Sequence, residues 1–199
     1  MKNNKSILII GNGQSILHSK IGSSIDKFDN IGRINNYRID SYEKYLGKRT
    51  DIWINGANQN LLKRKQIFSK IIVSIPSSII IKKNDKLTEH VSKRLKMKAK
   101  EFSIIAINDI KRYEKTVGHK RLTTGITSIL WGLDHFEQVF IHGFDFFINS
   151  KSHYYDSKFH SFINQYLLNK GHKHDNIKEQ KFIQKLINNG RIKKLVDNI

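Results

Sequence analysis

The sequence predicts a single α/β domain spanning residues 1–199, in which a mostly parallel sheet is flanked by helices. Short apolar runs rich in isoleucine alternate along the chain with segments whose apolar residues recur at helical spacing, and this alternation is typical of parallel sheets. The runs are continuously apolar, as expected of strands that are buried on both faces. Several of them end directly at glycine or asparagine.

The first apolar run, residues 7–10 (Ile-Leu-Ile-Ile), ends at Gly11-Asn12-Gly13. Glycine permits a sharp turn and a close approach of the backbone to a ligand, and Ser15 is placed to cap a helix beginning near Ile16. A strand, a glycine-rich turn and a helix N-terminus together commonly hold a phosphate or nucleotide. A tight turn after a buried strand explains the same residues, because the spacing is neither G-x-G-x-x-G nor that of a Walker loop.

The middle of the chain is expected to add four strands and one helix, each bounded by polar or turn residues. The strands are apolar segments at 30–34, 51–54, 70–75 and 102–107, and the helix covers 58–68. Residues 79–100 receive no assignment. Their basic residues are typical of the solvated face of a helix; these are Lys93, Arg94, Lys96, Lys98 and Lys100.

The last third of the chain returns to the sheet. Residues 124–133 predict a buried helix opened by Thr124, and residues 138–141 predict a strand that ends in His142-Gly143-Phe144-Asp145. Two further helices are expected at 159–168 and 177–187, followed by a short strand within 191–196.

Asparagine follows three of the predicted strands, at Asn12, Asn35 and Asn55. The carboxyl ends of parallel strands meet at one edge of the sheet, where ligands collect. An asparagine amide both donates and accepts hydrogen bonds, so three of them suit ribose hydroxyls, a carboxylate or a pyrimidine edge. Taken singly, each asparagine is more typical of a loop cap.

The composition is strongly basic, with 36 Lys and Arg against 17 Asp and Glu and a net charge of +19. Such a surface attracts polyanions, among them nucleic acid, anionic lipid and phosphorylated glycan, although heavy use of Ile, Asn and Lys also fits A/T-rich codons. The absence of cysteine excludes disulfides and thiolate metal sites. Without an apolar run of membrane-spanning length, we expect a cytoplasmic protein, with peripheral contact at the inner face of the cytoplasmic membrane as an option.

Residues 11–35 resemble the first sialyl motif of glycosyltransferase family 29, the animal-type sialyltransferases. The G-N-S/G, I-D-x-x-D and R-x-N parts of that motif are matched by Gly11-Asn12-Gly13, by residues 25–29 (Ile-Asp-Lys-Phe-Asp) and by Arg33-Ile34-Asn35. Residues 46–50 (Leu-Gly-Lys-Arg-Thr) resemble its G-x-K/R-T ending.

The other motifs of the family follow in the same order. Residues 122–145 resemble the second motif, with Thr123-Thr124-Gly125 at its start and Gly143-Phe144-Asp145 at its end. His153-Tyr154-Tyr155-Asp156 resembles the third motif, H-Y-x-E/D, and residues 174–179, from His174 to Glu179, resemble the last, H-x-x-x-x-E.

The chain is also similar to the small bacterial sialyltransferases of family 42, because Arg121-Leu122-Thr123-Thr124-Gly125 fits their R-x-T-S-G pattern. Both resemblances imply a GT-A-like, Rossmann-type sheet, a CMP-sialic acid donor, and inversion at the sugar carbon without a metal or other cofactor. The implied acceptor is a glycan, expected on a bacterial surface as in lipooligosaccharide or capsule biosynthesis.

The resemblance also implies roles for individual residues. His174 is the base that takes the acceptor proton, and His172, which follows a glycine as the family 42 base does, is the alternative. His153 donates to the leaving phosphate, with Tyr154 as helper. The donor-binding residues implied are Asn12, Gly13, Asn35, Asn55, Arg121, Thr123, Thr124, Gly125, Gly143, Asp145 and Tyr154. They place the nucleotide-sugar site in residues 7–56 and 121–156, and the acceptor and base segment in 157–190.

Two features depart from the families. The animal enzymes link their first two motifs by a disulfide, which a chain without cysteine does not form. Phe147 stands where family 42 has a tyrosine that donates to the leaving phosphate.

Three alternatives remain at this point. A nucleic-acid-binding α/β protein would explain the charge, and an inactive relative would bind a nucleotide without transferring a sugar. A metal site would use the histidines between His153 and His174, but no acidic residue stands at the spacing of a known site.

Overall fold

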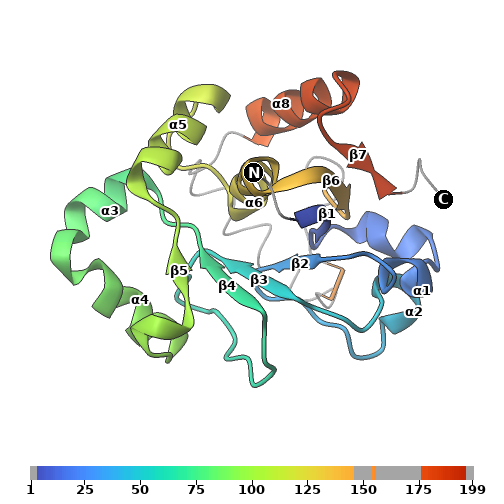
Figure 1. Ribbon diagram of the computed structural model, residues 1–199, viewed down its shortest axis with the longest axis horizontal. Coiled ribbons are helices and arrows are strands. Elements are labelled where there is room, and N and C mark those ends of the chain that lie inside the picture. Colours follow the sequence, from blue (N-terminus) through green and yellow to red (C-terminus); the bar gives the residue numbers. More distant parts are fainter. Residues whose placement is uncertain (1–3, 146–153, 156–175, 196–199) are drawn as a thin grey trace, which may run out of the picture.

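Seven parallel strands form one sheet, in the order β5-β4-β3-β2-β1-β6-β7, in the computed structural model, which describes residues 4–145, 154–155 and 176–195 (Figure 1). The strands are β1 (Asn4–Ile10), β2 (Ile31–Ile34), β3 (Ile52–Asn55), β4 (Lys70–Val73), β5 (Ser103–Ile104), β6 (Phe136–His142) and β7 (Lys193–Lys194). The chain builds outward from β1 to β5, then returns to add β6 and β7 on the other side of β1. The strand order therefore reverses between β1 and β6.

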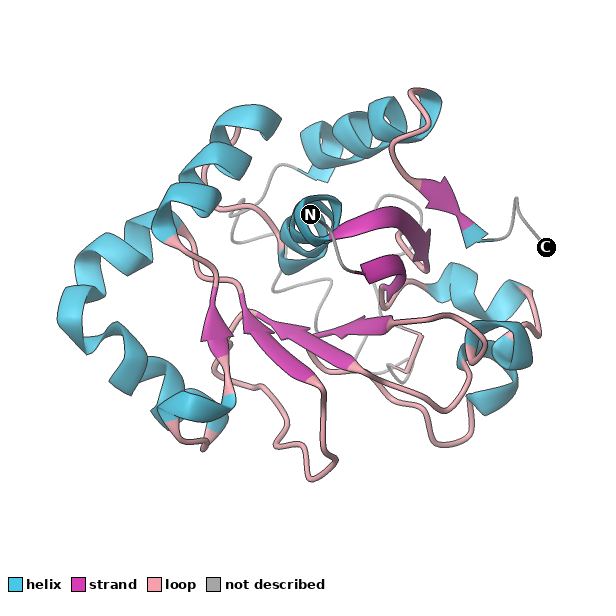
Figure 2. Ribbon diagram, in the orientation of Figure 1, coloured by secondary structure: helices cyan, strands magenta, loops and turns pink. Residues whose placement is uncertain are grey.

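Helices cover both faces of this sheet (Figure 2). One face packs against α5 (Ile107–Val117), α6 (Thr124–His135) and α8 (Asn176–Asn188). The other face is covered by short elements and by α4. These are η1 (Gln14–His18), α1 (Gly22–Ile25), α2 (Glu43–Leu46), and the run of α3 (Ser77–Lys83), η2 (Asn84–Lys86), α4 (Leu87–Leu95) and η3 (Ala99–Glu101) beside β4 and β5.

Strand β1 is the centre of the core. Its residues Ile7 and Ile9 enter the cluster under α6, while Leu8 and Ile10 enter the cluster under η1 and α1. All four are at most 2% exposed, and burial of each such side chain contributes about 1.5–3 kcal/mol. The continuous apolar run is thus explained by burial on both faces, and the predicted α/β class with a mostly parallel sheet is confirmed.

Two of the predicted elements are wrong. Residues 58–68 form an irregular loop instead of a helix, because their contacts fasten them to the neighbouring loop: Asn36 donates to Asn60 O (2.9 Å) and accepts from Leu62 N (2.7 Å). The strand expected at 102–107 is shortened to Ser103–Ile104, since β5 pairs only with β4 among the described strands and α5 already begins at Ile107.

The remaining elements agree more closely. The helix expected near Ile16 is a 3₁₀-helix, and the helices expected at 124–133 and 177–187 are α6 and α8. The helix expected at 159–168 lies outside the described residues. Within the described ranges, no helix is both long enough and apolar enough to cross a bilayer.

Candidate functional site

The loops after β1 and β6 meet where the strand order reverses, which is the usual ligand position in such sheets. Gly11 N donates to His142 O (2.8 Å) and Gly13 N donates to Gly143 O (2.9 Å). A Cβ on Gly11 would lie 2.2 Å from Gly143 O, and Gly143 has a φ of +70°. The two glycine-bearing turns are therefore in direct backbone contact, which a larger residue at position 11 would prevent.

Asp145, which follows β6, also stabilises the contact between the turns after β1 and β6. Its carboxylate accepts hydrogen bonds from Ser15 N (3.0 Å) and from the Ser15 hydroxyl. A Cβ on Gly13 would lie 2.4 Å from the Asp145 carboxyl carbon. Asp145, predicted to bind the donor, thus holds the start of η1 against β6, and Ser15 uses its hydroxyl here rather than as a helix cap.

Asn12 is fixed by two hydrogen bonds and keeps one atom unused. Its Nδ2 donates to Ile34 O and to Asn36 O, both at 3.1 Å, and the residue is 7% exposed. Its Oδ1 is buried and has no hydrogen-bond partner among the described residues. A buried acceptor without a partner is costly, so the site suits a ligand that brings an N–H or O–H donor.

Asn55, at the end of β3, carries the complementary feature. Its Oδ1 accepts from Ala57 N (3.0 Å), whereas its fully buried Nδ2 has no partner within the described part of the chain. Asn35 lies between these strands with a φ of +49°, and its Oδ1 accepts from Gly56 N (3.0 Å). The carboxyl edge of the sheet therefore carries an unpartnered acceptor, Asn12 Oδ1 after β1, and an unpartnered donor, Asn55 Nδ2 at the end of β3, among the described residues.

The N-terminus of α6 faces the same edge. Thr123 is its N-cap and accepts from Ile126 N (3.3 Å). A Cβ on Gly56 would lie 2.9 Å from Thr124 Oγ1, and one on Gly125 would lie 3.2 Å from the Phe144 ring. The first turn of α6 thus lies beside the loops after β3 and β6, where its partial positive charge favours an anion. Arg121 precedes it, exposed and with a φ of +66°.

Most residues of the segment that resembles the first sialyl motif form hydrogen bonds within that segment. Asp26 accepts from Lys48 N (2.8 Å) and Arg49 N (2.9 Å), so it fixes the loop after α2. Arg33, 1% exposed, donates to Leu46 O (2.6 Å) and Thr50 Oγ1 (2.9 Å). Its burial lowers the pKa of the guanidinium to about 10.

His142 is a buried residue that no sequence motif marked as functional. It is 4% exposed, and its Nε2 has no partner in the described ranges. Ile10 of β1 is in register with Arg33 of β2 on one side and with His142 of β6 on the other. Burial lowers the pKa of His142 to about 4, with Asp145 opposing that shift and Arg33 adding to it, so the ring is neutral at pH 7. Its only signal in the sequence is its position at the end of a predicted strand.

Tyr154 binds backbone groups. Its hydroxyl donates to Arg38 O and accepts from Arg38 N (2.7 Å), and its own N donates to Asn12 O (3.2 Å). Burial raises the pKa of Tyr154 to about 12. The hydroxyl that was predicted to help at the leaving phosphate therefore holds the loop after β2 beside Asn12.

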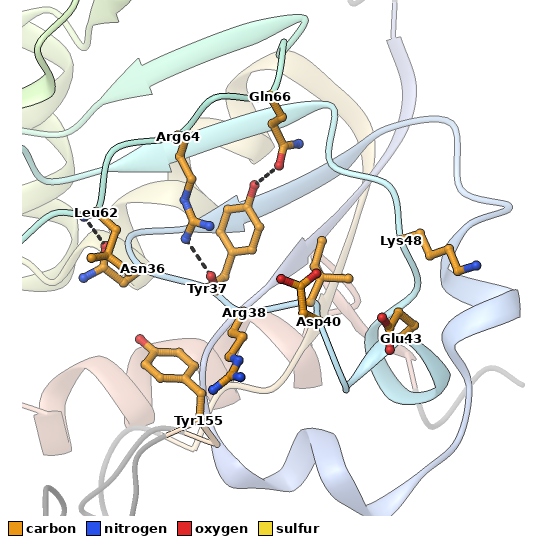
Figure 3. Close-up of a pocket in the computed structure, with 11 residues that line it drawn as sticks. Asn36, Tyr37, Arg38, Asp40, Glu43, Lys48, Leu62, Arg64, Gln66 and Tyr155 are labelled. Carbon is orange, nitrogen blue, oxygen red and sulfur yellow. Dashed lines mark hydrogen bonds between the residues drawn. The ribbon is translucent and has the colours of Figure 1, made fainter.

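A pocket of about 720 Å³ opens next to that loop (Figure 3). Arg64 lies over the Tyr37 ring (3.8 Å) and donates to Tyr37 O (2.6 Å), while the Tyr37 hydroxyl donates to Gln66 (3.0 Å). The pocket mixes charges with aromatic and amide groups. Its walls are Asn36, Tyr37, Arg38, Ile39, Asp40, Glu43, Lys48, Leu62, Arg64, Gln66 and Tyr155. The pocket has no signal in the sequence, because it depends on how the loop at 57–69 folds.

The three predicted catalytic histidines, His153, His172 and His174, lie outside the described residues. In the described ranges, no group of three or more His, Cys, Asp or Glu is arranged to hold a metal ion.

The family model described as "Glycosyltransferase family 29 (sialyltransferase)" matches residues 2–191. Lactosylceramide alpha-2,3-sialyltransferase of Rattus norvegicus is 24% identical over 231 residues, which include 100% of this chain and 58% of that protein. The chain thus spans somewhat more than half the length of this curated relative.

Two crystal structures share the fold. A mammalian sialyltransferase superposes with a TM-score of 0.70 at 20% identity, covering 96% of this chain and 69% of that one. A mammalian sialyltransferase in complex with Gal-beta-1-3GalNAc-ortho-nitrophenol gives a TM-score of 0.69 at 19% identity and the same coverage, 96% and 69%. With the family model matched along nearly the whole chain, the protein belongs to glycosyltransferase family 29, the sialyltransferases.

Proposed function

We propose that this chain transfers sialic acid, or a related acid sugar, from a CMP-linked donor to a glycan acceptor, with inversion and without a metal ion. The observation that carries the proposal is the family match over residues 2–191. The unpartnered amide atoms at the carboxyl edge support it, because a nucleotide sugar offers both donors and acceptors to complete them.

The donor is proposed to lie across the ends of β1, β2 and β3. Asn12 Oδ1 accepts from a hydroxyl or amino group of the nucleotide, and Asn55 Nδ2 donates to one of its oxygens. The first turn of α6, at Thr124 and Gly125, faces the phosphate or the sugar carboxylate, since a helix N-terminus stabilises negative charge.

The chemistry proposed is a single displacement. The acceptor oxygen attacks the anomeric carbon as the bond from that carbon to the CMP phosphate breaks, and the acceptor proton passes to His174. His153 donates a hydrogen bond to the departing phosphate, whose negative charge grows in the transition state. His172 is the alternative base.

The acceptor is proposed to enter the pocket beside the donor site. Asp40 and Glu43 offer carboxylate oxygens to sugar hydroxyls, Arg38 and Lys48 offer donors, and Tyr155 offers an aromatic face. The curated relative is named for lactosylceramide and an alpha-2,3 linkage, so we propose the glycan of a surface lipid as the acceptor. With a net charge of +19, we also propose peripheral contact with an anionic membrane.

The test is release of CMP from CMP-sialic acid with and without candidate galactosides. His174→Ala should lower turnover by about 10²–10⁴-fold and leave CMP affinity nearly unchanged, because the base faces the acceptor. His153→Ala should slow turnover and also weaken CMP binding. His172→Ala should have a mild effect. Full activity in both His172→Ala and His174→Ala would refute the base assignment, and no release of CMP by the unmodified chain with any acceptor would refute the function.

A further inference from the structure

We infer that the loop between β3 and β4, together with the C-terminal end of α4, forms a docking surface for an anionic lipid bilayer. The inference rests on the proposed membrane contact and adds the surface that makes it. We call this surface the β3–β4 surface; its residues are Leu62, Lys63, Lys65, Ile67, Arg94 and Lys96. The loop leaves the carboxyl end of β3 and runs back to the start of β4, and it projects at the bottom of the view in Figure 1.

The loop is held firmly by the side chains that point inward. Phe68 stacks on Trp53 with ring centroids 5.5 Å apart, and Arg64 lies over Tyr37. Leu61 packs against the core cluster beneath α4. These contacts fix the loop from both ends, so the side chains between them have a defined orientation.

Two aliphatic side chains of the same loop are left in solvent. Ile67 is 96% exposed and Leu62 is 59% exposed. An isoleucine this exposed adds almost nothing to the stability of the fold, because almost none of its apolar surface is buried. On a lipid surface it would enter the boundary between headgroups and acyl chains, which removes that area from water.

The two segments that form this surface are basic and carry no acidic residue, although Leu62 also lines the pocket that contains Asp40 and Glu43. Residues 57–70 and residues 90–100 contain no Asp or Glu. Lys63 and Leu62 share the wall of a small cavity with Arg94 and Lys96, which joins the loop to the end of α4. The basic run of α4 therefore continues into the loop, and lysine or arginine near an anionic membrane adds about fivefold to binding for each residue.

A lipid bilayer fits this combination better than a nucleic acid. Nucleic-acid surfaces add hydrogen-bonding and stacking side chains to their basic residues, whereas an exposed isoleucine contributes to neither. Docking would also have a consequence for the acceptor. Leu62, Arg64 and Gln66 of this loop line the 720 Å³ pocket, so the pocket would lie at the membrane, within reach of a lipid-borne glycan.

The test is flotation of the full chain with vesicles of phosphatidylcholine alone and with vesicles in which about one third is phosphatidylglycerol. We expect binding to the anionic vesicles that falls as salt rises, because exposed charges are screened over about 8 Å at physiological ionic strength. Ile67→Asp should lower binding at least about tenfold, since it removes apolar burial and adds a charge. Lys63→Glu with Lys65→Glu should lower it at least about 25-fold.

Matched variants elsewhere control for charge and hydrophobicity. Ile177 is 61% exposed on α8, so Ile177→Asp removes a similar exposed side chain. Lys111 and Lys115 are exposed on α5, so reversing both makes the same change in net charge. Ile177→Asp should bind vesicles within about twofold of the unmodified chain. The double lysine reversal on α5 should lose only the part of binding that depends on net charge.

Each outcome decides a separate question. Equal loss of vesicle binding in the control and loop variants would refute the β3–β4 surface as a lipid-docking site. The same conclusion would follow if the chain bound single-stranded DNA in a salt-sensitive way, bound no vesicles, and kept its DNA binding in Ile67→Asp. CMP release with a soluble acceptor is measured on the same variants and should not change for Ile67→Asp. Vesicle binding without any CMP release would refute the proposed transfer reaction and leave the surface standing.

Discussion

The carboxylate of Glu179 accepts hydrogen bonds from both the backbone amide (2.7 Å) and the hydroxyl (2.5 Å) of Thr123. Glu179 lies on α8 and is 1% exposed, and Thr123 is the N-cap of α6. The contact joins the last sialyl motif to the second one. It gives the glutamate of the final motif a structural role, because its carboxylate positions the helix N-terminus that faces the proposed donor site.

Glu179→Ala should therefore weaken both the fold and the donor site. Loss of two hydrogen bonds to a charged group at a buried position should cost about 3–6 kcal/mol of unfolding free energy, measured by denaturant unfolding. CMP affinity, measured by calorimetry below the melting temperature, should fall because the first turn of α6 is displaced.

Glu114→Ala is the matched control. Glu114 accepts from Ser77 N (3.1 Å) and Ser77 Oγ (2.5 Å) in the same way, but at the start of α3. It should cost a similar amount of stability with no loss of CMP affinity. Equal CMP affinities for the two variants would contradict the positioning role of Glu179.

Gly143→Ala should destabilise the protein more than Gly190→Ala. Both glycines have positive φ, +70° and +66°, so each substitution carries a strain of about 1 kcal/mol. A Cβ on Gly143 would also lie 2.5 Å from Ile16, whereas none of the residues that the structure describes lies within 4 Å of one on Gly190. The added overpacking should cost about 1–3 kcal/mol.

A double-mutant cycle with Ile16→Ala checks this explanation, because alanine lacks both Cγ1 and Cδ1, which would each lie 2.5 Å from a Cβ on Gly143. The smaller side chain should recover part of the loss in Gly143→Ala and none of the loss in Gly190→Ala. If Ile16→Ala rescues neither glycine variant, the contact between the β6 turn and η1 is not the cause.

The strands and α6 were predictable because their apolar runs report burial directly. The strand ends at Asn12, Asn35 and Asn55 follow from the same pattern, since parallel strands place their carboxyl ends at one edge. What each asparagine does at that edge was not predictable: Asn35 Oδ1 binds Gly56 N, while Asn12 Oδ1 has no partner in the described ranges. Such differences depend on contacts between residues that are far apart in the sequence.

The loop at 58–68 shows why local pattern failed. Its composition permits a helix, but Asn36 and Tyr37 fasten it to the loop after β2, and Phe68 stacks on Trp53. Tertiary contacts override weak helix propensity in a short segment. The pocket in Figure 3 follows from the same contacts, so the sequence alone gave no signal for it.

CMP should raise the melting temperature without added divalent metal, and Asn12→Ala should abolish that shift. A ligand at one hundred times its Kd stabilises the native state by about 2.7 kcal/mol. Asn12→Ala removes the proposed ligand acceptor along with two hydrogen bonds to the loop after β2. The measurement is a thermal melt with millimolar CMP in the presence of a chelator.

Asn30→Ala controls for the structural part of that loss. Asn30 Nδ2 also donates to a backbone carbonyl, Ser6 O (3.0 Å), but before β2 rather than after β1. It should lose stability and keep the full CMP shift. A normal CMP shift in Asn12→Ala would remove Asn12 from the donor site.

His142 should make the protein less stable as the pH falls from about 6.5 to about 4. Its pKa is lowered by burial from 6.5 to about 4, so between these values the unfolded chain binds a proton that the native chain does not. The contribution of His142 to the free energy of unfolding is therefore fully present above pH 6.5. It declines as the pH drops and changes no further below about pH 4. The two and a half pKa units correspond to about 3 kcal/mol. Denaturant unfolding at pH 7 and at pH 4.5 should show about 2.5 kcal/mol of this loss, and that part should be missing in His142→Leu. His18→Gln, which removes an exposed histidine, should keep the slope of the unmodified chain. An unchanged slope in His142→Leu would mean that acid unfolds the protein through other groups.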